Sequence, residues 1–304
     1  MLSLDRIGNA RAVLIAGATA SGKSAAALAL AEAAAQEGRL AWIVNADSMQ
    51  VYDALHVLTA RPSTADEARF PHRLYGHVSA ATRYSVGAWL RDMQAVLDEA
   101  GKADALVIAA GGTGLYFKAL TEGLASIPAV PPAIRRQLSE ELAERGVAFL
   151  HERLLRSDAA AADAIRPGDP QRVLRALEVF EGTGRSILEW QGMRAAPPLL
   201  PPEATARFVI EATRPILYER IEDRFDRMVE GGALDEVAAL LRLDLDPDLP
   251  VMKAIGVRAF AAHLRGAMPL EDAVAQAKTE SRRYAKRQTT WFRQQMRDWA
   301  RIGN

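Results

Sequence analysis

The sequence predicts an α/β protein with a parallel sheet core, a helical insertion and a helical C-terminal region. Three apolar runs, at 12–17, 40–47 and 105–112, lack strict alternation and end at a glycine or an aspartate, as buried parallel strands do. An alanine-rich helix is expected between the first two, over about 22–36, which completes a β-α-β unit. A fourth strand is expected at 206–213.

The middle of the chain has a different pattern, which predicts two domains. The proline clusters IPAVPP and APPLLPP bound a block of helical patterns that contains no strand-like run. We therefore expect a core formed by 1–126 and 200–304, with 127–199 as a helical insertion. Helices are also expected at 228–242 and 271–299.

Composition limits the classes of function that need to be considered. The 304 residues include no cysteine, which excludes disulfides, zinc-thiolate sites and cysteine nucleophiles. The five histidines show no metal-ligand spacing. No apolar run reaches the roughly 18 residues of a membrane span, and the N-terminus lacks the basic region of a signal peptide. A cytoplasmic protein that contacts no membrane is expected.

The charge is balanced overall but not locally. The 38 basic and 38 acidic residues give a net charge of zero, which by itself argues mildly against a nucleic-acid partner. Between 278 and 297, however, seven residues are basic and only Glu280 is acidic. Five of these bases fall within an arc of roughly 100° on a helix, namely Lys278, Arg282, Lys286, Arg293 and Arg297. Such a face is often only solvated, but this excess favours contact with phosphates.

The strongest local motif is Gly-Ala-Thr-Ala-Ser-Gly-Lys-Ser at 17–24, which fits G-x-x-x-x-G-K-[ST]. It directly follows an expected strand and precedes an expected helix, so a chance glycine turn is the weaker interpretation. The backbone can wrap a phosphate closely, Lys23 can neutralise it, and Ser24 can hold a magnesium ion. The motif predicts a P-loop NTPase-like core that binds phosphate. It does not indicate which molecule carries the phosphate.

Two further strand ends carry polar groups. Asp47 follows the second strand, beside the phosphate loop in a doubly wound sheet. By itself it could be a magnesium ligand or only the N-cap of a following helix. The run Gly-Gly-Thr-Gly at 111–114 follows the third strand and offers backbone N–H groups and the Thr113 hydroxyl.

The remaining motifs resemble, in order, those of the tRNA dimethylallyltransferase (isopentenyltransferase) family. The resemblance extends from about residue 13 to 294. After the phosphate loop, the matching stretches are DSMQVY, PHRL, GGTGLYFKAL, DPQRVLRALEVFEGTG, KAIG and RRYAKRQTTWFR. DSMQVY, DPQRVLRALEV and YAKRQTTWF are far more specific than a phosphate loop alone.

The resemblance implies an enzyme that transfers a dimethylallyl group from dimethylallyl diphosphate to the N6 amine of the adenosine adjacent to the anticodon of tRNA, releasing diphosphate. It implies a Mg²⁺ cofactor with Ser24 as a ligand. It implies diphosphate binding by Thr19, Ala20, Ser21, Gly22, Lys23 and Ser24. Asp47 would accept the proton of the amine, Thr113 would lie at the reacting centre, and Arg224 would bind the leaving diphosphate. A monomer is expected.

The resemblance also implies a contact surface for the tRNA anticodon stem-loop, to which the insertion contributes. Its members are Asp47, Ser48, Met49, Gln50, Thr113, Arg135, Gln171, Arg172, Val173, Leu174, Arg175, Lys253, Gly256, Lys286 and Arg287.

The chain departs from the family pattern at four places. Ala18 stands where proline is usual, and Ser24 where threonine is more frequent. The segment HVLTARP at 56–62 lacks the acid of the family's DIGTAKP-like segment, and Val257 stands where an aromatic residue commonly follows the glycine. Two alternative functions are a P-loop small-molecule kinase or ATPase, and a non-catalytic tRNA-binding module. The third strand ends in two glycines rather than the acidic pair usual in such kinases.

Overall fold

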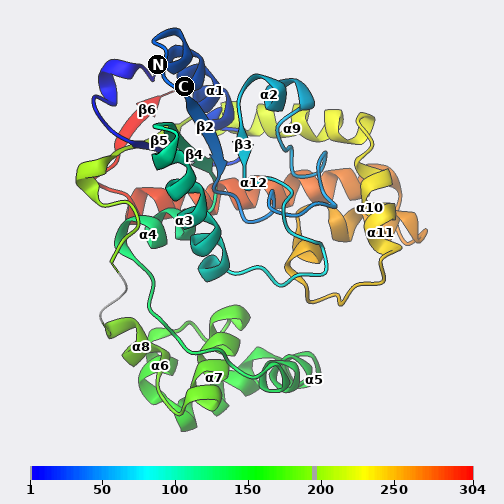
Figure 1. The fold of residues 1–304 in the computed structure, drawn as a ribbon. Helices are drawn as coiled ribbons and strands as arrows, with labels where there is room; N and C mark the ends of the chain where they lie inside the picture. The colour runs from blue at the N-terminus through cyan, green and yellow to red at the C-terminus, as the bar shows by residue number, and fades with distance from the viewer. Residues whose placement is uncertain (1, 194–196, 304) are drawn as a thin grey trace. The chain divides into compact units, whose positions relative to one another are not determined.

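Six strands, paired in parallel, form one sheet in the order β3-β2-β4-β1-β5-β6 (Figure 1). The computed structural model describes residues 2–193 and 197–303. The strands are β1 (Ala12–Gly17), β2 (Ala41–Asn45), β3 (His72–Arg73), β4 (Leu106–Gly111), β5 (Thr205–Glu211) and β6 (Ala300–Gly303). Every residue of β1 and β4 is buried, as their continuous apolar sequences predict. The predicted α/β fold with a parallel sheet is confirmed.

Helices cover both faces of the sheet. On one face α1 packs against Val13, Ile15 and Ile108, and on the other α3 and α4 pack against Leu14 and Val107. The helices of the core are α1 (Lys23–Gln36), α2 (Thr64–Arg69), α3 (Val86–Lys102), α4 (Gly114–Glu122), α9 (Arg214–Glu230), α10 (Ala233–Leu241), α11 (Val257–Leu264) and α12 (Leu270–Gln295). Short 3-10 turns occur at Leu4–Arg6, Pro202–Ala204 and Pro250–Lys253.

The long helix α12 joins two hydrophobic clusters. It contributes Ala273, Ala277 and Ala285 to a cluster with α9, α10 and α11. Near its end, Phe292 joins the cluster that covers one face of the sheet. Polar groups on α12 are thereby held at fixed positions relative to the strands.

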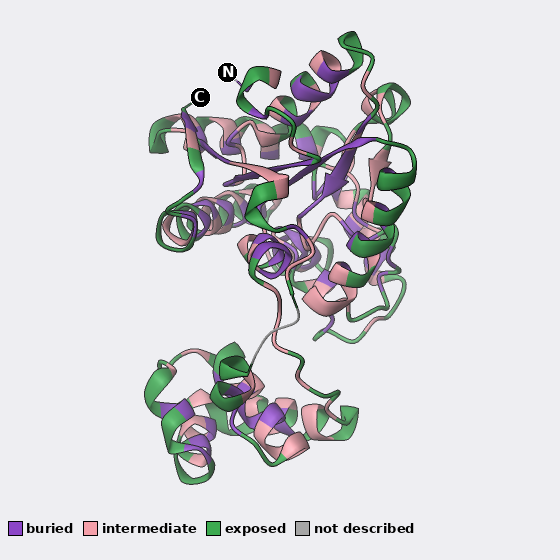
Figure 2. Cartoon of the chain, turned by 60° about the vertical axis from the view of Figure 1, so that its left-hand side comes forward, coloured by how far each residue is buried: buried purple, intermediate pink, exposed green. Residues whose placement is uncertain are grey.

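The chain divides into two compact units, one formed by 1–121 and 199–304 and the other by 122–198. The second unit is helical, with α5 (Pro132–Ser157), α6 (Ala159–Ala164), α7 (Pro170–Thr183) and α8 (Ile187–Gly192). Its own core includes Leu138, Leu150, Leu154, Val173 and Leu177. Figure 2 shows separate sets of buried residues within the sheet core and within this helical unit.

Three local features differ from the sequence prediction. The edge strands β3 and β6 are too short, or too polar, to be distinguished as strands by an apolar run. The helix expected over 271–299 ends at Gln295, where the chain turns to form β6. The helix expected over 228–242 is interrupted at Gly231 and Gly232, the second of which has a left-handed φ of 94°.

Within the described ranges 2–193 and 197–303, no helix is both long and apolar enough to cross a membrane.

Candidate active site

The loops that follow β1, β2 and β4 meet at one edge of the sheet. Because β4 pairs in parallel with both β1 and β2, the carboxyl ends of these three strands lie side by side. The phosphate loop leaves β1, Asp47 follows β2, and Thr113 follows β4. The arrangement thus brings the three predicted elements of the site to one place.

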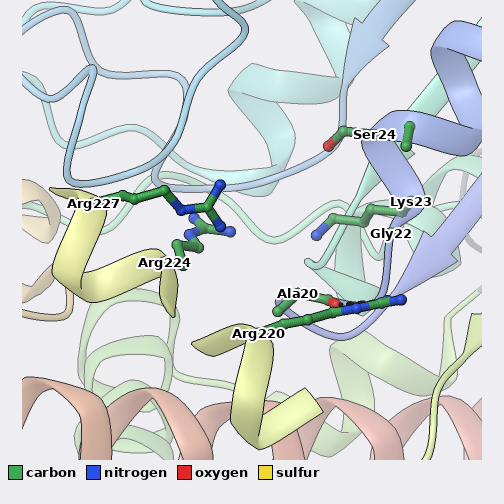
Figure 3. Close-up of a pocket in the computed structure, with 8 residues that line it drawn as sticks. Ala20, Gly22, Lys23, Ser24, Arg220, Arg224 and Arg227 are labelled. Carbon is green, nitrogen blue, oxygen red and sulfur yellow. Dashed lines mark hydrogen bonds between the residues drawn. The ribbon is translucent and has the colours of Figure 1, made fainter. Parts of the chain in front are cut away.

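The phosphate loop leads directly into α1. Gly22 has a left-handed φ of 93°, and Lys23 and Ser24 are the first two residues of the helix. Their position at the helix N-terminus presents unpaired backbone N–H groups and a partial positive charge to a pocket. The pocket is lined by Ala20, Gly22, Lys23, Ser24, Ala25, Arg220, Arg224 and Arg227 (Figure 3).

Three arginines of α9 face this pocket, of which only Arg224 was predicted. Arg220 and Arg227 are four residues before and three residues after it, so all three lie on one helical face. This spacing is the signal in the sequence that could have identified the other two. Figure 3 shows Lys23 and Arg224 pointing toward each other from opposite walls of the pocket. Four positive side chains around one pocket make an anion the expected ligand.

The pKa of Lys23 reflects its burial first and then its charged neighbours. It is lowered to about 8, mainly by burial; the charge of Asp47 raises it and the smaller effect of Arg224 lowers it. Burial also lowers the pKa of Arg224, again opposed by Asp47. A bound anion would relieve the repulsion between these cations, so ligand binding and Lys23 protonation are coupled.

Hydrogen bonds fix the loop that supports Arg224. The Nη2 atom of Arg224 donates to the Thr59 carbonyl at 3.1 Å, and Gln50 Nε2 donates to the same carbonyl at 2.9 Å. The segment just before Thr59 is held by Glu236, a residue of α10 that the sequence did not single out. Its carboxylate accepts the backbone N–H groups of 56–58 at 2.7, 2.7 and 2.9 Å. A carboxylate from another element therefore anchors the segment whose own acid is absent.

Asp47 is half-buried and shapes the turn after β2. Its Oδ1 accepts the Met49 N–H at 3.0 Å, while its own N–H donates to Asn45 Oδ1 at 2.8 Å. The next helix, α2, begins at Thr64 and is capped by Ser63, so the interpretation of Asp47 as a helix N-cap is wrong. The charge of Asp47 acts on both Lys23 and Arg224.

The charge of Asp47 also affects three tyrosines. Burial first, and then the charge of Asp47, raise the pKa values of Tyr75, Tyr116 and Tyr284 above the ordinary range. Tyr116 also stacks on Trp89 with ring centroids 4.3 Å apart. The charge of Asp47 thus acts on three tyrosines as well as on Lys23 and Arg224.

Thr113 joins the loops after β2 and β4. Its Oγ1 accepts the Ser48 N–H at 2.9 Å, and its N–H donates to the Ala46 carbonyl at 3.2 Å. The first of these bonds orients the turn that begins with Asp47. The predicted neighbours Ser48, Met49 and Gln50 lie in this same turn.

The residues predicted to contact RNA on the core have different exposures. Lys286 and Arg287 are exposed on α12, and Lys253 is exposed with its Nζ 3.1 Å from Asp248 Oδ1. Gly256 is buried with φ of 95°, and a side chain there would press on Leu58. The packing around Gly256 therefore disfavours direct contact between this residue and RNA.

The basic face expected on α12 is smaller than its sequence suggests. Lys278 Nζ lies 2.7 Å from Asp226 and 3.4 Å from Glu222, and Arg282 also pairs with Glu222. These two bases balance acids of α9. Of the five predicted bases, Lys286 and Arg293 are exposed on the helix, and Arg297 is exposed beyond its end at Gln295.

In the helical unit, the side chains of Arg135 and Arg175 converge on Glu178. Arg135 Nε and Arg175 Nη1 each lie 3.2 Å from this carboxylate, which is 1% exposed. Gln171 and Arg172 are exposed at the start of α7. Val173 is fully buried in the core of the unit, so its side chain cannot contact RNA, and Leu174 packs against that core.

Comparisons with known proteins assign this architecture to one family. A sequence model described as IPP transferase matches residues 50–295. A tRNA dimethylallyltransferase of Mesorhizobium japonicum is 54% identical over 293 residues, which cover 96% of this chain and 89% of that protein. These relatives do not support the alternative assignment to a small-molecule kinase or ATPase.

Solved structures are similar in fold. The full-length tRNA isopentenylpyrophosphate transferase of Bacillus halodurans has a TM-score of 0.66 and 31% identity, covering 96% of this chain and 89% of that one. A eukaryotic dimethylallyltransferase solved while acting on tRNA has a TM-score of 0.76 at 24% identity, covering 96% and 73% respectively, and supports the fold alone. By the extent of these matches, the chain belongs to the IPP transferase family.

Proposed function

We propose that the protein transfers a dimethylallyl group from dimethylallyl diphosphate to the N6 amine of the adenosine adjacent to the anticodon in tRNA, and releases diphosphate. The observation that carries this proposal is the electrostatic coupling of the Asp47 carboxylate to Lys23 and Arg224 of the anion pocket, at one edge of the sheet. The names of the relatives, which are tRNA dimethylallyltransferases, support the choice of substrates.

The donor would lie with its diphosphate in the pocket formed by the phosphate loop and α9. As the allylic C–O bond breaks, negative charge grows on the leaving diphosphate. Lys23 and Arg224, together with the N-terminal amides of α1, are placed to stabilise that charge. Arg220 and Arg227 line the same pocket and would contribute to diphosphate binding.

The acceptor would be the exocyclic amine of adenine, a poor nucleophile because its lone pair is delocalised into the ring. Asp47 would accept one N–H proton as the new C–N bond forms, which leaves the product amine neutral. Thr113 supports this role because it holds the backbone of the adjacent Ser48. The adenine must leave its stack in the anticodon loop to reach this sheet edge.

Magnesium is proposed as a cofactor, on the chemistry of the donors. Mg²⁺ prefers oxygen ligands and often takes several from substrate phosphates and water. The Ser24 hydroxyl lines the pocket and fits such a site. Within the described part of the chain, no group of three His, Cys, Asp or Glu residues is arranged to hold a metal, so the diphosphate would supply much of the coordination. A bound Mg²⁺ would supply additional neutralisation of the leaving group.

RNA contact is proposed for the exposed bases of both units. On the core these include Lys286 and Arg287 of α12 and Lys253. On the helical unit, the exposed Arg172 and the half-exposed Arg135 and Arg175 are proposed, the last two of which are held by Glu178. Such contacts to phosphates strengthen binding without reading the base sequence.

Nucleoside mass spectrometry tests the proposal. Unmodified tRNA incubated with the protein, Mg²⁺ and dimethylallyl diphosphate is expected to gain one dimethylallyl group on the adenosine next to the anticodon. A parallel reaction with ATP in place of the isoprenoid diphosphate is expected to leave the tRNA unchanged and to release no phosphate. Phosphate release from ATP without any modified nucleoside would favour the kinase or ATPase assignment.

A further inference from the structure

Gln288 of α12 is a polar residue in a buried position, only 5% exposed. The other buried residues of this helix are small or apolar, namely Ala273, Ala277, Ser281, Ala285 and Phe292. A buried side-chain amide is costly unless its oxygen and nitrogen are both hydrogen-bonded. Its partners therefore indicate what the residue does.

Both ends of the Gln288 amide bind backbone groups at the candidate site. Its Oε1 accepts the Thr19 N–H of the phosphate loop at 2.8 Å, and its Nε2 donates to the Gly112 carbonyl at 2.9 Å. One side chain thus connects the loop after β1 with the loop after β4. The first of these loops would hold the diphosphate, and the second carries Thr113.

The amide also lies close to the proposed base. Gly112 has no room for a side chain, because a Cβ there would collide with Gln288 Nε2 and lie 3.2 Å from Asp47 Oδ2. Tyr284, one helical turn before Gln288, interacts with the side chains of both Gln288 and Thr113, each of which lowers its pKa against the larger effects of burial and Asp47. The network therefore reaches all three predicted parts of the site.

We propose that Gln288 is a positioning residue that holds the phosphate loop and the Asp47–Thr113 side of the site at a fixed separation. The inference rests on the proposed function, in which a C–N bond forms between groups carried by these two sides. Such a reaction requires the two atoms to approach within about 3.5 Å, and a misplacement of about 1 Å can cost on the order of 100-fold in rate. A glutamine suits the position because it accepts and donates without adding charge beside Asp47 and the diphosphate.

The test compares Gln288→Met, which keeps the length of the side chain but loses both hydrogen bonds, with Gln294→Met, at an exposed position of the same helix. Gln288→Met is expected to lower the steady-state kcat by about 10- to 100-fold, with KM for both substrates changed by no more than about threefold. A kcat within about threefold of wild type would overturn the proposal, as would an equal loss in the Gln294 variant.

Hydrogen–deuterium exchange supplies a measurement that needs no transfer reaction. In Gln288→Met, the backbone amides of 17–24 and of 111–115 are both expected to exchange about tenfold faster, because both loops lose their shared contact. If either loop keeps its wild-type exchange rate, the proposed connection is wrong. Absence of transfer by the wild type would instead contradict the proposed function, and the exchange result would still decide the role of Gln288.

A third variant covers the case in which the apolar side chain prevents folding. Gln288→Glu keeps an acceptor for the Thr19 N–H but can donate to the Gly112 carbonyl only when protonated. The ratio of its kcat to that of wild type is expected to rise as pH falls. A ratio that does not change with pH would reduce Gln288 to a packing role and overturn the proposal.

Discussion

Replacing Asp47 with asparagine separates its role as a base from its role in the fold. The Oδ1 atom of asparagine can still accept the Met49 N–H, which Asp47 accepts at 3.0 Å, so the turn after β2 is expected to persist. The amide cannot take up the amine proton. Loss of a general base typically costs about 10²- to 10⁴-fold, which corresponds to about 3 to 5 kcal/mol in the barrier.

The substitution also acts on Lys23. Because the Asp47 charge raises the pKa of Lys23, which lies at about 8, its removal lowers that pKa further. The comparison should therefore be made well below pH 8, which favours the protonated form of Lys23 in both proteins. Under that condition, a loss of rate does not come from deprotonation of Lys23.

The assay is single-turnover transfer with enzyme in excess, combined with tRNA binding measured without the isoprenoid diphosphate. Asp47→Asn is expected to bind tRNA about as tightly as wild type and to transfer at least about 100-fold more slowly. The exposed Asp98→Asn on α3 serves as the control and should match wild type in both measurements. Transfer by Asp47→Asn within about tenfold of the wild-type rate would remove Asp47 from the chemical step.

Three more predictions follow from charges in the structure. Burial lowers the pKa of Lys23 to about 8, and a bound anion would raise it, so above that pH diphosphate binding should take up a proton. Calorimetry should therefore show the affinity for diphosphate falling as pH rises past about 8. An affinity that does not change with pH would contradict the coupling between Lys23 protonation and diphosphate binding. Lys286→Glu should weaken tRNA binding and reduce the slope of log affinity against log salt by about 1. The control Lys102→Glu, at the exposed end of α3, should change neither the affinity nor the slope. An unchanged slope in Lys286→Glu would mean that Lys286 does not contact the RNA. Glu178→Gln should lower the free energy of unfolding by about 1 to 3 kcal/mol in denaturant, because two half-exposed arginines lose a buried charged partner. The exposed Glu152→Gln should lower it by no more than about 0.5 kcal/mol. Equal destabilisation by the two substitutions would refute a structural role for the buried carboxylate.

The sequence predicted those parts of the fold whose pattern is local. The strands at 12–17 and 105–112 are buried on both faces, so their continuous apolar runs distinguish them without any knowledge of their partners. The phosphate loop is equally local, because its glycines, Lys23 and Ser24 occupy eight consecutive positions between a strand and a helix. β3 carries no such pattern, since two residues at a sheet edge become a strand only through pairing with β2.

The candidate site divides in the same way. Residues in contiguous motifs, such as Asp47 and Thr113, could be named from the sequence by their resemblance to a family. Arg220 and Arg227 share a helical face with Arg224, which their spacing indicates, but only the placement of α9 opposite the phosphate loop makes that face part of the pocket. Glu236 and Gln288 act on backbone groups far away in the chain, which no spacing in the sequence records.

By itself, the sequence determined the parallel core, the anion-binding loop and the family. Only the tertiary structure decided which charges are free to bind a ligand and which are already balanced. Lys278 and Lys286 illustrate this, because both are bases on the same helix, yet the first pairs with Glu222 and Asp226 while the second is exposed. The physical reason is that Coulomb energy depends on distance and burial, and both are set by how helices pack rather than by their order in the chain.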